Sequence, residues 1–177
     1  MHIALLRAIN LPSHGKVTKA DLRAFMAAIG FETCQSLLQT GNLVFDGGAR
    51  KADQLERLLE AESKKRLGLE TDYFVRTSKE LQAIVDANPF PKEAASDPGH
   101  LIVIALKDAP AAAQVKALQA SIAGREVVKT VGRNAYAVYP DGIGRSKLTL
   151  VRIEKHLGTR GTGRNWNTIR KLAALAC

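Results

Sequence analysis

A short apolar run that predicts a central β-strand occurs twice in this chain, and it constrains the fold more than any other feature. The runs are Ile3–Arg7 and Leu101–Leu106. A strand that is apolar on both faces lies inside a sheet that is covered on both sides. Each run is followed by the same predicted order: a helix, two strands in a hairpin, a second helix and a last strand. The halves share this order without a detectable sequence repeat, so solenoid folds are excluded.

The first half carries clear helix and hairpin signals. Thr18 is expected to cap a helix, with Asp21 three residues later in a loose capping box. The segment Thr40-Gly41-Asn42 lies between two β-like runs and is a hairpin signal. The expected elements are a helix at 18–29, strands at 33–39 and 43–45, a helix at 51–67 that Gly68 ends, and a strand at 71–76.

The second half repeats the order around a second hairpin signal, Gly132-Arg133-Asn134. The expected elements are a helix from about 108 to 122, strands at 126–131 and 135–139, a helix at 147–157, a short strand near 159–164 and a last helix at 168–176. Between the halves lie a predicted helix at 79–87 and the Pro-rich stretch Asn88-Pro89-Phe90-Pro91. The predicted fold is therefore α+β, with two ferredoxin-like (βαββαβ) modules in tandem and a C-terminal helix. The expected boundaries are 1–77 for the first module, 78–98 for the connection and 99–177 for the second.

Composition points to an ordinary globular protein, with 46% hydrophobic and 24% charged residues. The first strand-like run reaches Arg7 at once and shows no cleavage pattern, so no signal peptide is expected. No apolar run approaches the roughly 20 residues that span a bilayer. Cys34 and Cys177 could pair, but two cysteines are weak evidence for a disulfide framework. We therefore expect a cytoplasmic protein without membrane contact, and the oligomeric state is left open.

Positive charge is concentrated near the C-terminus. The net charge is +9, and residues 133–177 hold 9 basic and 2 acidic side chains, which is +7 of that total. A concentrated excess of this kind attracts nucleic acid or phosphorylated small molecules. The alternative is a solvated surface that keeps the protein soluble.

Four polar stretches stand at predicted strand ends or helix starts. They are Arg7–Asn10 with Lys16 beyond, Gln39–Asn42, Gly142–Lys147 and Gly161–Thr168. The last two are glycine-rich, carry arginine and precede predicted helices, where unpaired backbone N–H groups and the helix dipole favour an anion. The alternative is that Ser146 and Asn167 or Thr168 only cap helices while the glycines form turns.

The single tryptophan, Trp166, lies between two asparagines. It could anchor a core or a hinge with its indole N–H satisfied locally. Beside Arg164 it could instead stack on a base or a sugar.

Catalytic and metal signatures are missing from the sequence. The four histidines are scattered without the spacing of a metal site, and no nucleophile elbow or cysteine–histidine pattern is present. Asp141 is the one carboxylate near the glycine–arginine cluster. No metal, no cofactor and no assignable catalytic residue are therefore expected.

The chain resembles a bacterial family catalogued as domain of unknown function 1697, over nearly its whole length. The blocks that carry the resemblance are Ile3–Asn10, Leu22–Phe31, Gln39–Phe45, Asn88–Pro91, Tyr139–Leu148 and Arg164–Thr168. The resemblance implies two ferredoxin-like subdomains and no established activity, substrate or cofactor.

The four polar stretches coincide with the polar blocks of that family, so we expect them to converge on one cleft. The expected ligand-binding residues are Arg7, Asn10, Lys16, Gln39, Asn42, Arg145, Ser146, Lys147, Arg164, Asn165 and Trp166. The leading hypothesis is a non-catalytic module that binds nucleic acid or a nucleotide-like phosphate ester. The alternatives are an enzyme acting on a small phosphorylated or carboxylated substrate, and an interaction or oligomerisation module that pairs sheet edges.

Overall fold

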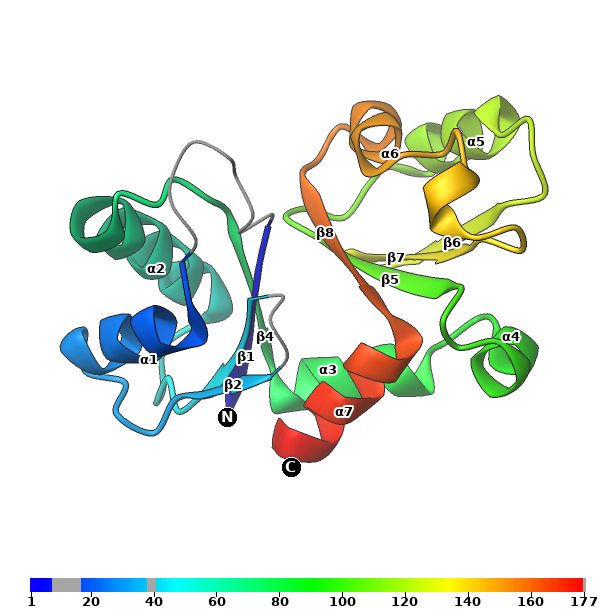
Figure 1. The fold of residues 1–177 in the computed structure, drawn as a ribbon. Coiled ribbons are helices and arrows are strands. Elements are labelled where there is room, and N and C mark those ends of the chain that lie inside the picture. The colour runs from blue at the N-terminus through cyan, green and yellow to red at the C-terminus, as the bar shows by residue number, and fades with distance from the viewer. Residues whose placement is uncertain (8–16, 38–40, 177) are drawn as a thin grey trace. The chain divides into compact units, whose positions relative to one another are not determined.

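The computed structural model describes residues 1–7, 17–37 and 41–176. The chain divides into two compact units, one of residues 1–82 with the described residues from Leu172 onward, the other of residues 83–171 (Figure 1). Each unit contains one sheet, and we call them the N-terminal and C-terminal modules. Asn10, Lys16, Gln39 and Cys177, which the sequence singled out, lie outside the described residues.

The N-terminal module has one antiparallel sheet with the strand order β2-β3-β1-β4. Its elements are β1 (His2–Leu6), α1 (Lys19–Ala28), β2 (Gln35–Leu37), β3 (Asn42–Phe45), α2 (Ala52–Leu67) and β4 (Tyr73–Thr77). The predicted capping box at the start of α1 is confirmed, because the Thr18 hydroxyl accepts from the Asp21 N–H at 3.1 Å while the Asp21 carboxylate accepts from the Thr18 N–H at 2.8 Å. The helix α2 ends at Gly68, whose φ of 63° favours glycine.

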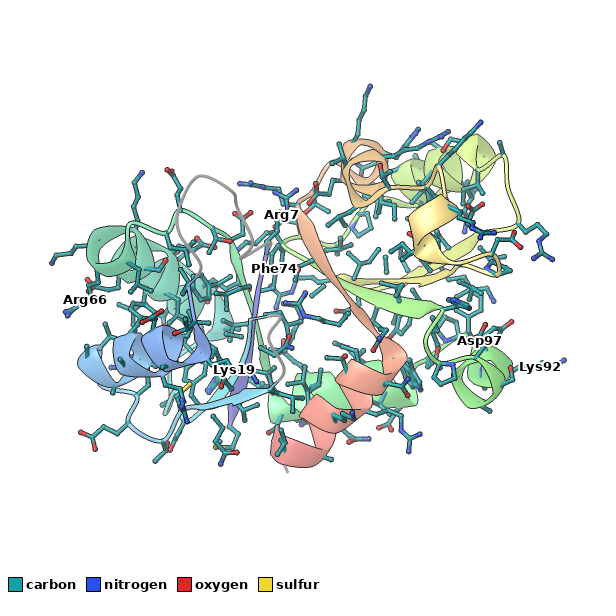
Figure 2. All side chains as sticks on the ribbon, viewed as in Figure 1. Arg7, Lys19, Arg66, Phe74, Lys92 and Asp97 are labelled. Atoms are coloured by element: carbon teal, nitrogen blue, oxygen red, sulfur yellow. The ribbon has the colours of Figure 1, made fainter. Side chains whose placement is uncertain are left out.

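One face of this sheet packs against α1 and α2, because alternate residues of a strand face one side (Figure 1). Ala4 and Leu6 of β1 join Phe25 of α1 and Leu59 of α2 in this core. Phe74, on the other face of β4, is also fully buried. Side chains at the rim such as Arg66 extend outward instead (Figure 2).

Two helices follow β4: α3 (Ser78–Asp86) and α4 (Pro91–Ser96). The first matches the helix predicted at 79–87. The second was not predicted, since the Pro-rich stretch was interpreted as a connection. Pro91 stands in the first turn of α4, where the missing N–H would have no partner in the helix anyway.

The C-terminal module has a second antiparallel sheet with the order β6-β7-β5-β8. Its elements are β5 (Leu101–Leu106), α5 (Ala112–Ser121), β6 (Val127–Val131), β7 (Asn134–Val138), a 3₁₀ turn at Ile143–Arg145, α6 (Leu150–Leu157) and β8 (Gly161–Asn165). The last helix, α7 (Trp166–Ala176), begins in this module, and its residues from Leu172 onward belong to the N-terminal module. The short strand predicted near 159–164 is present as β8. Ile102, Ile104 and Leu106 face α5 and α6 in the core.

Three helix starts differ from the prediction. The helix predicted from about residue 108 begins at Ala112, and the N–H of Ala111 before it donates to the Gln114 side chain at 2.7 Å. The other two differ because of their caps. The helix predicted from Lys147 begins at Leu150, since the Thr149 hydroxyl accepts from the Arg152 N–H at 3.3 Å. The helix predicted from Thr168 begins at Trp166, since the Asn165 side chain accepts from the Thr168 N–H at 2.9 Å.

The described residues thus form an α+β protein with two four-stranded antiparallel sheets and seven α-helices. Each half has the predicted order of strands and helices. None of the helices described combines the length and the apolar character needed to cross a membrane.

Candidate functional site

The loop between β7 and α6 is held in place by its own hydrogen bonds. The Gly142 N–H donates to the Tyr139 carbonyl at 2.9 Å, and Gly142 adopts a φ of 84°, which favours glycine at this turn. The Tyr139 hydroxyl donates to the Leu148 carbonyl at 3.0 Å. The Leu148 N–H donates to the Ser146 hydroxyl at 2.9 Å. These bonds fix the segment that carries Arg145 and Lys147.

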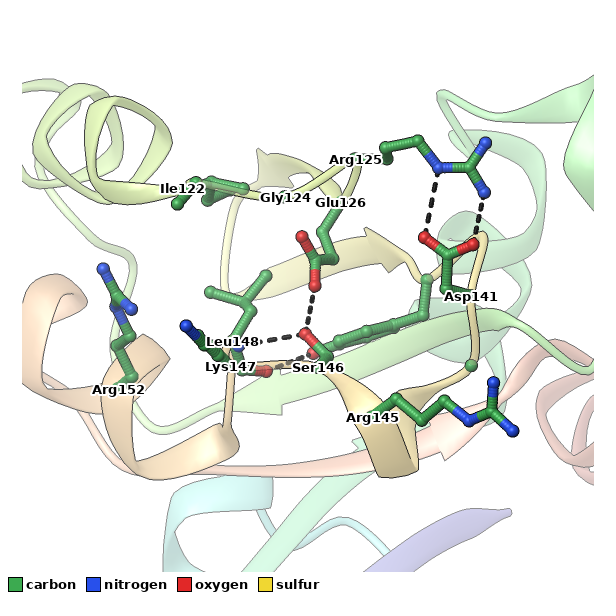
Figure 3. A pocket seen from close by; sticks show the side chains of 13 residues that line it. Ile122, Gly124, Arg125, Glu126, Asp141, Arg145, Ser146, Lys147, Leu148 and Arg152 are labelled. Atoms are coloured by element: carbon green, nitrogen blue, oxygen red, sulfur yellow. Dashed lines mark hydrogen bonds and ion pairs between the residues drawn. The ribbon is translucent and has the colours of Figure 1, made fainter.

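A pocket of about 310 Å³ lies between this loop and the segment that joins α5 to β6 (Figure 3). Both segments, and the start of α6, belong to the C-terminal module. The lining residues are Ile122, Ala123, Gly124, Arg125, Glu126, Tyr139, Asp141, Gly142, Arg145, Ser146, Lys147, Leu148 and Arg152. Four of these side chains are cationic and two are carboxylates, so the lining has two positive charges in excess.

Arg125 and Asp141 form an exposed ion pair across the two segments. The Arg125 guanidinium donates to both carboxylate oxygens of Asp141, at 3.1 Å and 2.5 Å. This hydrogen bond, with the charges of Arg125 and Arg145, lowers the pKa of the Asp141 carboxyl. Asp141 is therefore a carboxylate whose charge is largely offset by its neighbour.

Glu126 is the second carboxylate of the pocket, and it is held by a serine. The Ser146 hydroxyl donates to Glu126, and this bond is the main reason why the pKa of Glu126 is lowered, with a smaller contribution from the Arg152 charge. Gly124 leaves room for this arrangement, because a Cβ at that position would lie 2.1 Å from Oε2 of Glu126. Glu126 is thus a fixed, ionised acceptor on the pocket wall.

The other three cations of the pocket differ in whether their side chains donate hydrogen bonds within the protein. Arg152 donates to the Ser121 carbonyl. The exposed side chains of Arg145 and Lys147 donate no hydrogen bond to any residue that the structure describes. They come from a loop of fixed backbone, so the pocket presents two cations with free donors.

Of the residues predicted from the sequence, Arg145, Ser146 and Lys147 line this pocket, while Arg164, Asn165 and Trp166 lie elsewhere in the C-terminal module. Arg164 donates to Thr162 Oγ1 at 2.9 Å and to the Gly163 carbonyl at 2.8 Å, and burial lowers its pKa to about 10. Asn165 caps α7.

Trp166 is only 4% exposed. It borders a shallow groove whose other lining residues are Val85, Asp86, Asn88, Pro91, Ala94, Ala95 and Arg170. The prediction that it stacks on a ligand stays a prediction.

The glycines of the fourth polar stretch lie within β8, where neighbouring side chains of β5 leave little room for a Cβ. A Cβ at Gly161 would lie 2.8 Å from Ile104 Cγ2, and one at Gly163 would lie 3.1 Å from Ile102 Cγ2. The interpretation of this stretch as a glycine-rich loop before a helix is therefore wrong: it is a strand whose glycines accommodate the isoleucines of β5.

In the N-terminal module, Arg7 and Asn42 lie at the same end of the sheet. Asn42 opposes Leu5 across β1 and β3, is 1% exposed, and donates from its side chain to the Leu37 carbonyl at 3.0 Å. Arg7 follows β1 and lies 3.7 Å from the Asp72 carboxylate (Figure 2). Convergence of all four stretches on one cleft stays a prediction.

Sequence reasoning missed three charged residues of the pocket, Arg125, Glu126 and Arg152, and noted Asp141 without placing it among the ligand-binding residues. The available signal was the pair Arg125-Glu126 directly after Gly124 and before a β-like run, at the entry to the neighbouring strand. No cluster of metal-ligating side chains occurs within residues 1–7, 17–37 and 41–176. Burial raises the pKa of the Cys34 thiol to about 11, so this cysteine is not a thiolate nucleophile at neutral pH.

Comparison with known proteins gives the family and the fold. The profile of a family described as "Protein of unknown function (DUF1697)" matches residues 1–136, so the chain belongs to that family, as the resemblance predicted. A solved structure entitled "The structure of conserved bacterial protein SP0830 from Streptococcus pneumoniae" is similar, with a TM-score of 0.77 and 19% identity over 99% of this chain and 98% of that one. At this identity the likeness shows the fold alone. A search of curated proteins gives no significant match.

Proposed function

We propose that this member of the DUF1697 family binds a small phosphate ester in the pocket of its C-terminal module. The observation that carries the proposal is a pocket with two cationic side chains, Arg145 and Lys147, that donate no hydrogen bond to the described residues around them. Hydrogen bonds between such cations and phosphate oxygens are the strong, charge-assisted kind. Arg152 also lines the pocket and adds a third positive charge.

The size of the pocket favours a small ligand over a polynucleotide. Its volume of about 310 Å³ is at the lower end of the range for small-molecule sites. Binding a nucleic acid backbone calls for a basic surface that follows several phosphates. Here, by contrast, the cations line one pocket, beside the apolar side chains of Ile122 and Leu148.

An enzyme acting on the same class of compound is the second candidate. One observation favours it: the Ser146 hydroxyl donates to Glu126, the geometry in which a base activates a nucleophile. The lowered pKa of Glu126 argues the other way, because a general base works best with a pKa near the working pH. Binding without turnover is therefore the first choice.

Calorimetric titration with inorganic phosphate and ethyl phosphate tests the proposal. The double variant Arg145→Ala/Lys147→Ala should bind both at least about a hundredfold more weakly, because each charge-assisted hydrogen bond contributes about 1.5–3 kcal/mol. The matched control is Lys116→Ala/Lys155→Ala, which removes the same charge from exposed helix positions that do not line the pocket.

The control separates a pocket from general attraction of anions. Equal losses in the two double variants would mean that phosphate responds to net charge alone. No heat of binding to the unaltered protein at millimolar phosphate or ethyl phosphate would overturn the proposal.

We further propose that both modules are ferredoxin-like. The support is the order βαββαβ in each half together with the matching strand orders β2-β3-β1-β4 and β6-β7-β5-β8.

A further inference from the structure

The phosphate group would occupy only part of the pocket. A volume of about 310 Å³ is at the lower end of the range for sites that enclose a whole small molecule, which is larger than a phosphate group. The part of the lining that the cations do not form includes the two carboxylates, Glu126 and Asp141, and the side chains of Tyr139 and Leu148. What these groups can recognise decides which phosphate ester fits.

Glu126 has acceptor capacity that its protein partner does not exhaust. An ionised carboxylate has about four lone-pair sites, and the Ser146 hydroxyl takes one of them. A hydrogen bond to its own backbone N–H takes another. The Ser146 hydroxyl holds the carboxylate, and the missing side chain of Gly124 leaves room for it. It therefore offers a ligand fixed acceptors and no donor.

Asp141 matters less for direct recognition, because its two oxygens already accept from Arg125. Its charge still acts on the site, since it opposes the lowering of the Glu126 pKa. Glu126 thus lies between the positive charge of Arg152 on one side and the Arg125–Asp141 pair on the other (Figure 3).

We infer that the ligand is the phosphomonoester of a small polyhydroxy compound, such as a sugar phosphate, and that Glu126 accepts hydrogen bonds from its hydroxyl groups. This inference rests on the proposed function. The phosphate is bound by the exposed side chains of Arg145 and Lys147, which leave the loop on either side of Ser146 (Figure 3), and the hydroxyl groups reach Glu126. A bare alkyl ester leaves the carboxylate facing a group that cannot donate, so it binds less tightly.

The test compares ethyl phosphate with ribose 5-phosphate, which share the ester group and differ in hydroxyl groups. Calorimetry on the unaltered protein should give a dissociation constant at least tenfold lower for ribose 5-phosphate. Ribose alone should bind far more weakly than either. Inorganic phosphate should match ethyl phosphate.

Two variants then test whether Glu126 is the group that binds the hydroxyl groups of the ligand. Glu126→Gln keeps an acceptor for Ser146 but replaces the other oxygen with a donor, so the ratio of the two dissociation constants should fall to less than threefold. Both esters gain from the loss of the negative charge, so this ratio, and not either constant alone, is the readout. Gly124→Ala should reduce the same ratio without changing the charge, because its Cβ displaces the carboxylate. Emission from the buried Trp166, outside this pocket, checks that each variant is folded.

The outcomes distinguish phosphate binding in the pocket from recognition of hydroxyl groups by Glu126. Binding of ethyl phosphate with no gain for ribose 5-phosphate overturns the inference and leaves the proposed function standing. A tenfold gain that survives in both variants overturns the role of Glu126. If neither ester binds, the proposed function fails and the inference fails with it.

Discussion

The N-terminal and C-terminal modules share one frame, and the register of their strands shows it residue by residue. Ile3 of β1 pairs with Arg76 of β4, and Val103 of β5 pairs with Arg164 of β8. Each arginine donates to the carbonyl of the residue before it, at 2.9 and 2.8 Å. Because these positions match, differences around them reflect the side chains of each module and not a different fold.

The edge strands β4 and β8 are held by different numbers of carboxylates. Glu56 and Glu60 of α2 accept from two backbone N–H groups of β4, at 2.8 and 3.0 Å. Glu154 of α6 accepts from the Gly161 N–H of β8 at 2.8 Å, and the residue four positions earlier, which matches Glu56, is Leu150. Glu56 also lies 3.8 Å from Arg76, so the N-terminal module contains a buried ion pair at a place where the C-terminal module has an apolar side chain.

A second difference involves one residue of the pocket. In the N-terminal module, Phe31 and Phe45 pack with ring centroids 4.8 Å apart. The strand register matches Phe45 with Ala137, and counting back from the paired strands β2 and β6 matches Phe31 with Arg125. Two aromatic rings thus fill a corner of one module, while the other has a small residue and an arginine that lines a pocket. The position of a buried phenylalanine in one module is therefore taken in the other by an exposed arginine of the pocket.

Replacing Glu56 with leucine, the residue of the other module, should have the largest effect on stability. Arg76 is 2% exposed, and Glu56→Leu removes a carboxylate partner from a buried cation. Breaking a buried pair in this way costs about 3–5 kcal/mol. Urea unfolding measures the loss in the free energy of unfolding. Asp53→Ala, which breaks the exposed pair with Arg57 on the same helix, is the control and should cost less than about 1 kcal/mol; equal losses would contradict the prediction.

Gly161→Val should have the next largest effect, because it puts a branched side chain where the C-terminal module has none. Its Cβ would lie 2.8 Å from Ile104 Cγ2 and 3.0 Å from Leu106 Cδ2, and overpacking of this kind costs about 1–3 kcal/mol. In the N-terminal module the matching strand positions carry Tyr73 opposite Leu6, with Ala4 at the position of Ile104. Large and small side chains are thus exchanged between the two strands.

The additional change Ile104→Ala tests this explanation. Combined with Gly161→Val, it should cost less than the sum of the two single variants in urea unfolding, because it removes the atoms that clash. Strictly additive losses would show that the glycine is needed for another reason.

The same glycines show why part of the site could not be predicted from the sequence. Gly161 and Gly163 stand before a predicted helix, where glycines can let an anion approach the backbone, and the isoleucines that explain these glycines are about sixty residues earlier in the chain. Local pattern cannot show such a contact. The pocket has the same origin, since Arg125 and Asp141 meet only when two segments fold together.

More of the fold than of the site could be predicted from the sequence, because the patterns that indicate helices and turns involve residues close together in the chain. The capping box at Thr18, the hairpin around residues 132–134 and the glycine at position 68 each depend on a few neighbouring residues, and each is present as predicted. The helix α4 was missed because its six residues, which begin at Pro91, are too few to show the apolar spacing of a helix. Helix starts at Leu150 and Trp166 shifted because the capping side chain, and not the first polar residue, sets the boundary.

His2→Ile should have the smallest effect, and it concerns pH. His2 occupies the position of Ile102 in the C-terminal module, is 5% exposed, and accepts from the Gly47 N–H through Nδ1 at 3.2 Å. Burial, and then the positive charge of the amino terminus, lowers its pKa below 6.5. As the pH falls below 6.5, the unfolded chain takes up a proton at His2 before the folded protein does, so stability decreases until the pH is below the folded pKa.

The isoleucine variant does not titrate at this position and should lose less stability over that window. Urea unfolding of both proteins at pH 7.5, 6.5 and 5.5 gives the difference in the free energy of unfolding at each pH. That difference should shift in favour of the variant as the pH falls, although the variant loses the acceptor for Gly47 at every pH. Because the nearby carboxylates Asp46 and Glu80 are common to both proteins, they cancel in the comparison. A difference that stays constant from pH 7.5 to 5.5 would mean that His2 takes up its proton equally in the folded and unfolded chains.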